Sequence, residues 1–223
     1  MTRMPVAFVG HGSPMTIVTP ERDTPWTIWA AKMPAPRAIL AVSAHWQLPR
    51  PALGAVQTMP LVYDFGGFPE ELYEATYPAP GALELAARVR ELLPDVDDQP
   101  ERGLDHGAWA PLLYLYPRAD VPVVQLAMPR APLADLYALG QQLAPLRDEG
   151  VLVLGSGNVT HNLRQADFRE RTPTPAWAKD FDAWTADVLA RGDADALCTA
   201  QAHAPQFTTA HPTHEHFDPL VIC

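Results

Sequence analysis

Short apolar runs recur along this chain, and each stops at a glycine, a histidine or a turn signal. The strongest runs occupy residues 5–10, 38–44, 121–128 and 151–154. Apolar runs of about four to eight residues that are bounded by turn residues are typical of buried strands. These four runs therefore predict strands, and residues 54–57 predict a further short one.

Between the strands the apolar residues recur at helical spacing. A segment reaching to about residue 33 predicts a short helix or a loop, and Asp105 is a plausible N-cap for a helix that starts at His106. Further helices are expected over residues 81–93, 132–147 and 175–190. In the last of these, Trp177, Phe181, Trp184 and Val188 follow one another at intervals of three or four residues, which favours a core-facing stripe over a binding surface. Residues 63–69, rich in aromatics and glycines, are expected to form an ordered surface loop.

The alternation of strands and helices predicts the fold class. It indicates an α/β protein with a mostly parallel central sheet that helices cover on both faces. No repeat or linker divides the 223 residues, so residues 1–223 are expected to form a single domain.

Composition narrows the range of partners. A formal net charge of −10 without any Lys/Arg cluster argues against a nucleic-acid partner. No segment approaches the roughly 18 apolar residues of a membrane span, and no signal peptide is evident, so we expect a cytoplasmic protein without a membrane partner. The two cysteines, Cys198 and Cys223, are not expected to form a disulfide. These features favour a protein that binds small molecules.

Several histidines stand where ligands commonly bind. His11, His45 and His161 each come just after a predicted strand or its glycine loop, and ligands of α/β proteins bind at the carboxyl ends of the strands. His106 lies at a helix start, where the helix dipole favours a neutral imidazole. Each of these residues, taken alone, is about as compatible with a structural role as with a functional one. His203 has no such context and is expected at the surface.

The C-terminal region adds a cluster of histidines. His211, His214 and His216 lie within six residues of one another, and His214 and His216 would face the same side of a strand. The order of residues is not the H-E-x-x-H of a zincin helix, and a fortuitous polar tail is the alternative. Together, however, the histidines offer three imidazole ligands and a fourth ring able to act as a base, which suits iron, zinc or copper.

Six motifs in order resemble those of a known family. They are Gly10-His-Gly-Ser-Pro-Met15, Ser43-Ala-His-Trp46, Asp64-Phe-Gly-Gly-Phe-Pro69 with Tyr77-Pro-Ala-Pro-Gly81, Asp105-His-Gly-Ala-Trp109, Gly155-Ser-Gly-Asn-Val-Thr-His-Asn-Leu163 and Pro212-Thr-His-Glu-His-Phe217. The series covers nearly the whole chain. It resembles the class III extradiol ring-cleavage dioxygenases of the LigB-like superfamily, in the subgroup similar to 4,5-DOPA extradiol dioxygenase.

The resemblance implies one divalent metal ion per chain, bound by His11, His45 and His216. It implies that His161 acts as an acid/base group or as a fourth ligand, and that His106 lines the substrate pocket. Ring cleavage calls for Fe(II), although members of the family are found with Zn(II), which has no accessible redox change. The implied substrates are a DOPA-like catechol and dioxygen. With His161 taking a phenolic proton, the implied product is a ring-opened semialdehyde.

The chain also departs from the family pattern. His214 stands where the family usually has proline and Asp218 where it has leucine, and relatives continue beyond this motif into a further strand-bearing tail. Two alternatives remain open at this point: a zinc-dependent hydrolase that uses the same ligands, and a non-enzymatic binding protein on the same fold. The sequence leaves open whether the chain forms a homo-oligomer.

Overall fold

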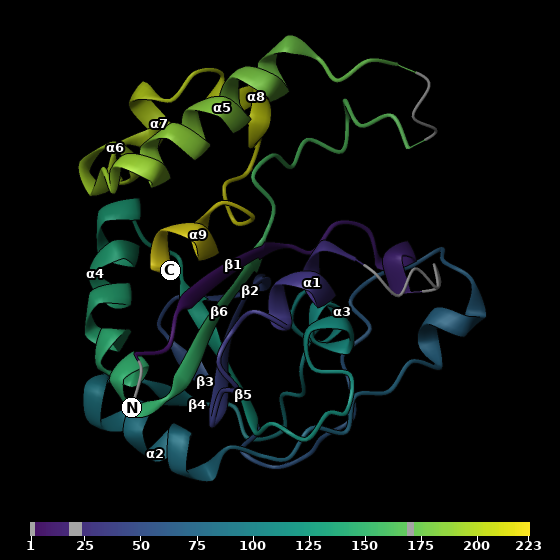
Figure 1. The fold of residues 1–223 in the computed structure, drawn as a ribbon, viewed down its shortest axis with the longest axis vertical. Helices are drawn as coiled ribbons and strands as arrows, with labels where there is room; N and C mark the ends of the chain where they lie inside the picture. The colour runs from purple at the N-terminus through teal and green to yellow at the C-terminus, as the bar shows by residue number, and fades with distance from the viewer. Residues whose placement is uncertain (1–2, 18–23, 169–171) are drawn as a thin grey trace.

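Six strands form one sheet in the computed structural model, which describes residues 3–17, 24–168 and 172–223 (Figure 1). The strands lie in the order β1-β6-β2-β5-β3-β4. Their bounds are Val6–Gly10 for β1, Ala38–Leu48 for β2, Ala52–Leu53 for β3, Asp97–Asp98 for β4, Val123–Pro129 for β5 and Val151–Gly157 for β6. All neighbouring pairs are parallel except β3 with β5, which is antiparallel. The predicted, mostly parallel sheet is confirmed.

The helices lie close to the predicted segments. The longer ones are α1 (Pro25–Ala30), α2 (Leu83–Leu92), α3 (His106–Leu115), α4 (Leu133–Leu143) and α5 (Ala176–Arg191). Short helices follow in the C-terminal part: α6 (Ala194–Cys198), α7 (Ala200–His203), α8 (Phe207–Ala210) and α9 (Asp218–Ile222). Within the described ranges there are also three 3₁₀ turns: η1 (Pro14–Ile17), η2 (Glu70–Tyr73) and η3 (Ala144–Glu149), of which η3 extends α4 toward β6.

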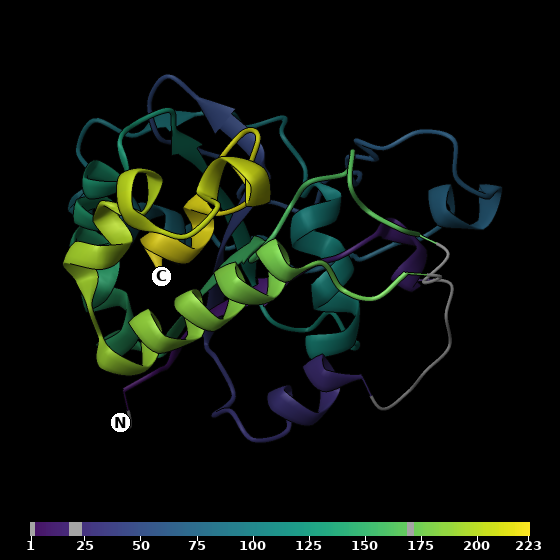
Figure 2. The same cartoon turned by 90° about the horizontal axis from the view of Figure 1, so that it is seen from above.

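Helices cover both faces of the sheet, as expected (Figures 1 and 2). Alternate residues of β2, such as Leu40 and Val42, pack in one core with α2, α4, α5 and α9. The intervening residues Ile39 and Ala41 pack in a second core with α3. Helix α1 packs against α3. In α5, Phe181 and Val188 are fully buried, and both tryptophans of the predicted stripe pack on the same core. That stripe is therefore core, as predicted.

Two short strands predicted from the sequence are absent at their predicted positions. The short strand lies at Ala52–Leu53 and not at residues 54–57. The N–H of Gly54 still donates to the carbonyl of Gln125 in β5 (2.9 Å), but that of Ala55 donates to the carbonyl of Arg102 (2.9 Å), which lies outside the sheet. Residues 211–217 form no strand, so His214 and His216 do not alternate on a pleat; a turn leads there directly into α9. The turn is closed by backbone bonds from the amides of Phe217 and Asp218 to the carbonyl of His214.

Other expectations can be checked directly. Cys198 and Cys223 are both free thiols, and His203 is exposed on α7. Among the described residues, no helix has the length and apolar character needed to cross a membrane.

Candidate metal centre

The carboxyl ends of the central strands carry the histidines into one cluster. His11 follows β1 directly, and its backbone N–H donates to the carbonyl of Gly157 at the end of β6 (3.0 Å). His45 was expected just beyond the end of β2, but the strand continues to Leu48. The pairing of β2 with β5 slips between Val42 and Gln47, so His45 lies in an irregular stretch of the strand. Such bulges re-aim side chains beside functional sites, and this one places the ring of His45 against that of His11.

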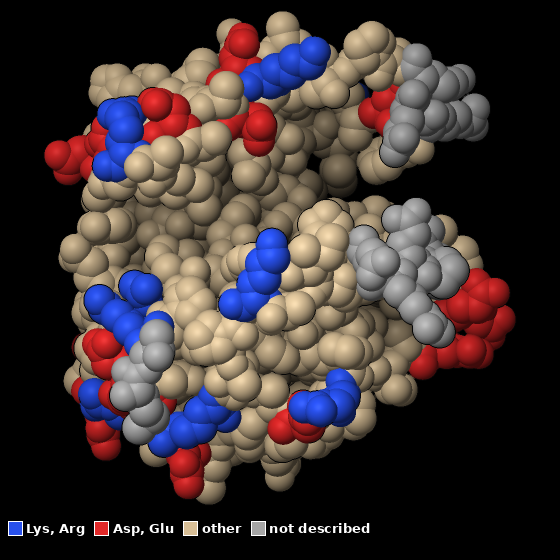
Figure 3. Space-filling view, in the orientation of Figure 1, with Lys and Arg blue, Asp and Glu red and all other residues tan. Residues whose placement is uncertain are grey.

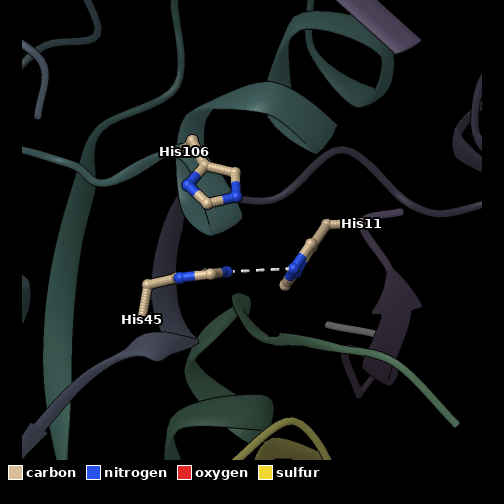
Figure 4. Close-up of side chains that lie close together, drawn as sticks. All are labelled: His11, His45 and His106. Carbon is tan, nitrogen blue, oxygen red and sulfur yellow. Dashed lines mark hydrogen bonds between the residues drawn. The ribbon is translucent and has the colours of Figure 1, made fainter. Parts of the chain in front are cut away.

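His106 belongs to the first turn of α3 and lies above the rings of His11 and His45 in Figure 4. The fully buried Asp105 caps this helix by accepting the N–H of Ala108 (3.2 Å). Gly107, the next residue, has no room for a side chain, because a Cβ there would overlap Ser43 and lie 2.9 Å from the ring of His45. A glycine is therefore required for α3 to approach β2 this closely.

The rings of His11 and His45 face each other through their Nε2 atoms, which are 3.1 Å apart (Figure 4). Ser156 determines the tautomer of His11. Its hydroxyl donates to the carbonyl of Gly107, so its oxygen accepts the Nδ1–H of His11 (3.0 Å). The Nε2 atom of His11 therefore carries a lone pair. A buried lone pair facing another ring nitrogen at this distance suits a shared cation, since protein ligands bind zinc at about 2.0–2.1 Å.

His216 completes the cluster from the turn before α9. Its ring centroid lies 5.3 Å from that of His11 and 5.0 Å from that of His45. Glu215 accepts the Nδ1–H of His216 (3.0 Å), whereas the buried Nε2 has no hydrogen-bond partner among the described residues. An unpartnered buried nitrogen is costly unless something binds it, which makes this atom a candidate ligand.

His161 follows β6 and lies against His216. The two rings stack with their centroids 3.3 Å apart and an angle of 14° between their planes. The backbone N–H of His161 donates to the carbonyl of Ala210 (2.9 Å), which fixes the loop to the C-terminal segment. Burial, together with the neighbouring His216, lowers the pKa of His161 to about 4, so its imidazole is neutral at pH 7.

Two of the ligand candidates, His11 and His45, are neutral as well. Burial and the nearby rings lower the pKa of His11 well below its ordinary value and that of His45 to about 3. Although burial alone would raise the pKa of Asp64, its hydrogen bond with His106 brings that pKa to about 2. The centre thus presents neutral imidazoles beside an ionised carboxylate, the protonation state that a metal ion requires.

All five predicted site residues meet in this cluster, yet the tightest groups differ from the predicted ligand set. Ligand atoms of His11, His45 and His106 lie within 4.8 Å of one another, and so do those of His161, Glu215 and His216. The predicted set of His11, His45 and His216 takes members from both groups. His211 stays outside, packed among Phe181, Phe207 and Phe217.

Three residues of the site were not predicted from the sequence. Ser156 orients His11, Glu215 orients His216, and Asp64 lies against both His45 and His106. Asp64 and Glu215 stand inside two of the six motifs, where an acidic residue beside glycines or histidines was the available signal.

In the space-filling view the surface is hollowed between the C-terminal helices and the sheet, and uncharged residues form most of the floor (Figure 3).

Comparisons with known proteins agree with this architecture. The family described as "Catalytic LigB subunit of aromatic ring-opening dioxygenase" matches residues 8–223. A 4,5-DOPA dioxygenase extradiol of Beta vulgaris is 40% identical over 96% of this chain and 84% of its own length. A protein of the same name from Escherichia coli K12 is also 40% identical, over 99% of this chain and 84% of its own.

The crystal structure of an uncharacterized protein from Escherichia coli K12 superposes with a TM-score of 0.79 at 34% identity, covering 99% of this chain and 87% of that one. The names of the relatives favour a ring-opening enzyme over the hydrolase and binding-protein alternatives. The chain belongs to the LigB family and is an oxidoreductase of the aromatic ring-opening dioxygenase type.

Proposed function

We propose that the protein is an extradiol dioxygenase that opens the ring of a catechol at one Fe(II) ion per chain. The observation that carries this proposal is the facing pair of Nε2 atoms on His11 and His45, which are 3.1 Å apart. The same cluster contains the ring of His216, whose buried Nε2 has no hydrogen-bond partner in the described part of the chain. Three imidazoles gathered at the carboxyl edge of a parallel sheet fit a divalent metal.

His11, His45 and His216 would hold the ion. When bound, Fe(II) brings catechol and dioxygen together and carries electrons between them, which Zn(II) cannot do because it has no accessible redox change. With only neutral ligands, the ion keeps its full positive charge, and this favours an anionic catecholate. Zn(II) fits the same nitrogens and would occupy the site without supporting ring cleavage.

His161 is the proposed proton acceptor for the catechol hydroxyl. Its ring is neutral at pH 7, and its stacking on His216 keeps it at the edge of the centre. The protonated ring can then return the proton later in the reaction. His106 would line the pocket on the other side, where its ring meets Phe65 edge-on at 5.4 Å. Aromatic walls of this kind suit a flat, partly apolar ring.

The test is to remove bound metal with a chelator, reconstitute the protein with Fe(II) under anaerobic conditions and measure oxygen uptake with a series of catechols. We expect one dioxygen to be consumed per ring opened, with the visible absorbance of a semialdehyde product. A sample that binds one Fe(II) per chain but consumes no oxygen with any catechol would contradict the proposal.

Three variants test the assignment of roles. His11→Ala should abolish stoichiometric metal binding, whereas His203→Ala, on the exposed helix α7, should leave it intact. His161→Ala should retain the metal and lose turnover by about 10²–10⁴-fold, the usual contribution of a general base. Loss of metal in His161→Ala would instead identify this residue as a ligand.

A further inference from the structure

Asp64 lies between two histidines of the centre. Its Oδ1 is 2.8 Å from Nδ1 of His106 and 3.1 Å from the backbone nitrogen of the same residue. Its Oδ2 is 3.3 Å from Nδ1 of His45. One carboxylate therefore contacts a residue of the metal centre and a residue of the pocket wall.

The loop that carries Asp64 is fixed to α3. The backbone N–H of Val62 donates to the carbonyl of Leu104 (2.8 Å), and the indole N–H of Trp109 donates to the carbonyl of Val62 (3.2 Å). The hydroxyl of Tyr63 donates to the carbonyl of Ala75 (2.7 Å). These bonds, made by the two residues that precede Asp64, hold its backbone in place, although its side chain is still 22% exposed.

The chemistry of a carboxylate limits the tautomers of both rings. An ionised carboxylate only accepts hydrogen bonds, so the Nδ1 of His106, which is hydrogen-bonded to it, carries the proton. The same carboxylate, 3.3 Å from the Nδ1 of His45, favours the tautomer of that ring with the proton on Nδ1. A neutral imidazole has one N–H, so both Nε2 atoms are then left with lone pairs. In His45 that lone pair faces the Nε2 of His11, and in His106 it lies on the edge of the ring away from Asp64.

We propose that Asp64 is a positioning residue that fixes the tautomer of His45 for the metal and that of His106 for the substrate. The first role rests on the metal site of the proposed function, and the second on its catechol substrate. Carboxylates that accept the second N–H of a histidine ligand orient the ring and raise its basicity. Here a single carboxylate would do so for the metal ligand His45. At the same time, it would leave the Nε2 of His106 free to accept a hydrogen bond in the substrate pocket.

A purely structural role predicts something different. Because Asp64 also accepts the backbone N–H of His106, it could simply stabilise the first turn of α3. Asparagine retains an oxygen that can accept this N–H, so Asp64→Asn would then be harmless. Under the proposal, the amide offers an N–H toward one of the rings, forces that ring into the other tautomer and weakens metal binding.

The experiment compares Asp64→Asn with Glu71→Gln in the full-length chain. Glu71 is exposed on η2, so its substitution removes the same charge from the same region without touching the centre. Zn(II) affinity is measured by competition with a chromophoric chelator, and the Co(II)-loaded proteins are compared by visible absorption. We expect Asp64→Asn to weaken Zn(II) binding by about 10–100-fold and to change the Co(II) spectrum, with Glu71→Gln unchanged.

Two further variants separate the roles. In a His106→Ala background, Asp64→Asn should still weaken Zn(II) binding, because that effect acts through His45. If Asp64→Asn does not fold, Asp64→Glu carries the test, since its longer side chain must shift the rings and alter the Co(II) spectrum.

Several results would overturn the proposal. They are wild-type Zn(II) affinity in Asp64→Asn, an equal loss in Glu71→Gln, disappearance of the loss in the His106→Ala background, or an unaltered Co(II) spectrum in Asp64→Glu. Zinc affinity and cobalt absorption do not depend on oxygen uptake. A failed dioxygenase assay would therefore count against the proposed function and leave this test standing.

Discussion

Gly157, the last residue of β6, allows the turn that carries His216 to approach the sheet. A Cβ at this position would overlap the carbonyl oxygen of His216 and lie 3.0 Å from the carbonyl carbon. That same carbonyl accepts the N–H of Asn158 (2.9 Å), so the turn is bonded to the end of the strand. In Gly157→Ala, one of these backbones must move.

The size of the movement follows from the contact distances. Non-bonded carbon atoms are in optimal contact at about 3.5–4.0 Å, so the turn must shift by at least about 0.5 Å. Metal–ligand distances tolerate only about 0.2 Å. We therefore expect Gly157→Ala to weaken Zn(II) binding by on the order of 10–100-fold, the range seen when the support of a ligand is lost. Overpacking should also lower the free energy of unfolding by about 1–3 kcal/mol.

Gly140→Ala is the matched control. Its Cβ would overlap the carbonyl oxygen of Ile222 in α9 and lie 2.9 Å from the carbonyl carbon, a similar clash six residues beyond His216. Urea denaturation and chelator competition are measured on both variants. Comparable losses of stability are expected, with the large loss of metal affinity confined to Gly157→Ala. Wild-type metal affinity in Gly157→Ala, or an equal loss in Gly140→Ala, would refute the idea that β6 positions His216.

Two further predictions concern stability. Burial lowers the pKa values of His11 and His45, so between about pH 6.5 and pH 4 the unfolded chain holds protons that the native state lacks. The free energy of unfolding of the metal-free protein should then fall as the pH falls through this window, by up to about 1.4 kcal/mol per pH unit for each histidine. A free energy of unfolding that stays constant from about pH 6.5 to pH 4.5 in equilibrium denaturation would count against this prediction. The buried Asp218 accepts hydrogen bonds from His214 (2.7 Å) and Gln47 (2.9 Å). Asp218→Ala should therefore lower the free energy of unfolding, measured by urea denaturation, by about 1.5–3 kcal/mol. An unchanged denaturation midpoint would show that these hydrogen bonds contribute nothing to stability.

The sheet could be predicted because its buried strands are continuous apolar runs. Strands β1, β2, β5 and β6 each lie on a predicted run, and the helices between them follow helical spacing. The two-residue strand β3 could not be located, since an element this short has no periodicity. The predicted end of β2 was also wrong, because the shift of register beyond Val42 depends on the pairing with β5 and not on local sequence.

The candidate site could be predicted in part. The positions of His11 and His161 follow from strands that end at one edge of the sheet, whereas His216 was found through its motif and placed on a strand that does not exist. The contact between Asp64 and His45 joins a loop to a strand 19 residues earlier in the chain. No local pattern specifies such a contact, because it depends on how the loop packs against α3.

The departures from the family pattern gain a structural explanation. His214 and Asp218, noted separately in the sequence, are hydrogen-bonded to each other one helical turn apart. Asp218 also accepts a bond from Gln47, two residues after His45 in β2. The pair therefore links the turn that carries His216 to the strand that carries His45. Neither residue alone indicated this link.

The central claim is that one metal ion is held by His11, His45 and His216. It is tested most directly by a crystal structure of the Fe(II)-loaded protein, with the ion located from anomalous scattering. We expect a single ion bonded to the Nε2 atoms of these three residues, with His106 beyond bonding distance. An ion bound by His11, His45 and His106 while His216 stays away from it, or two ions in the cluster, would contradict this assignment.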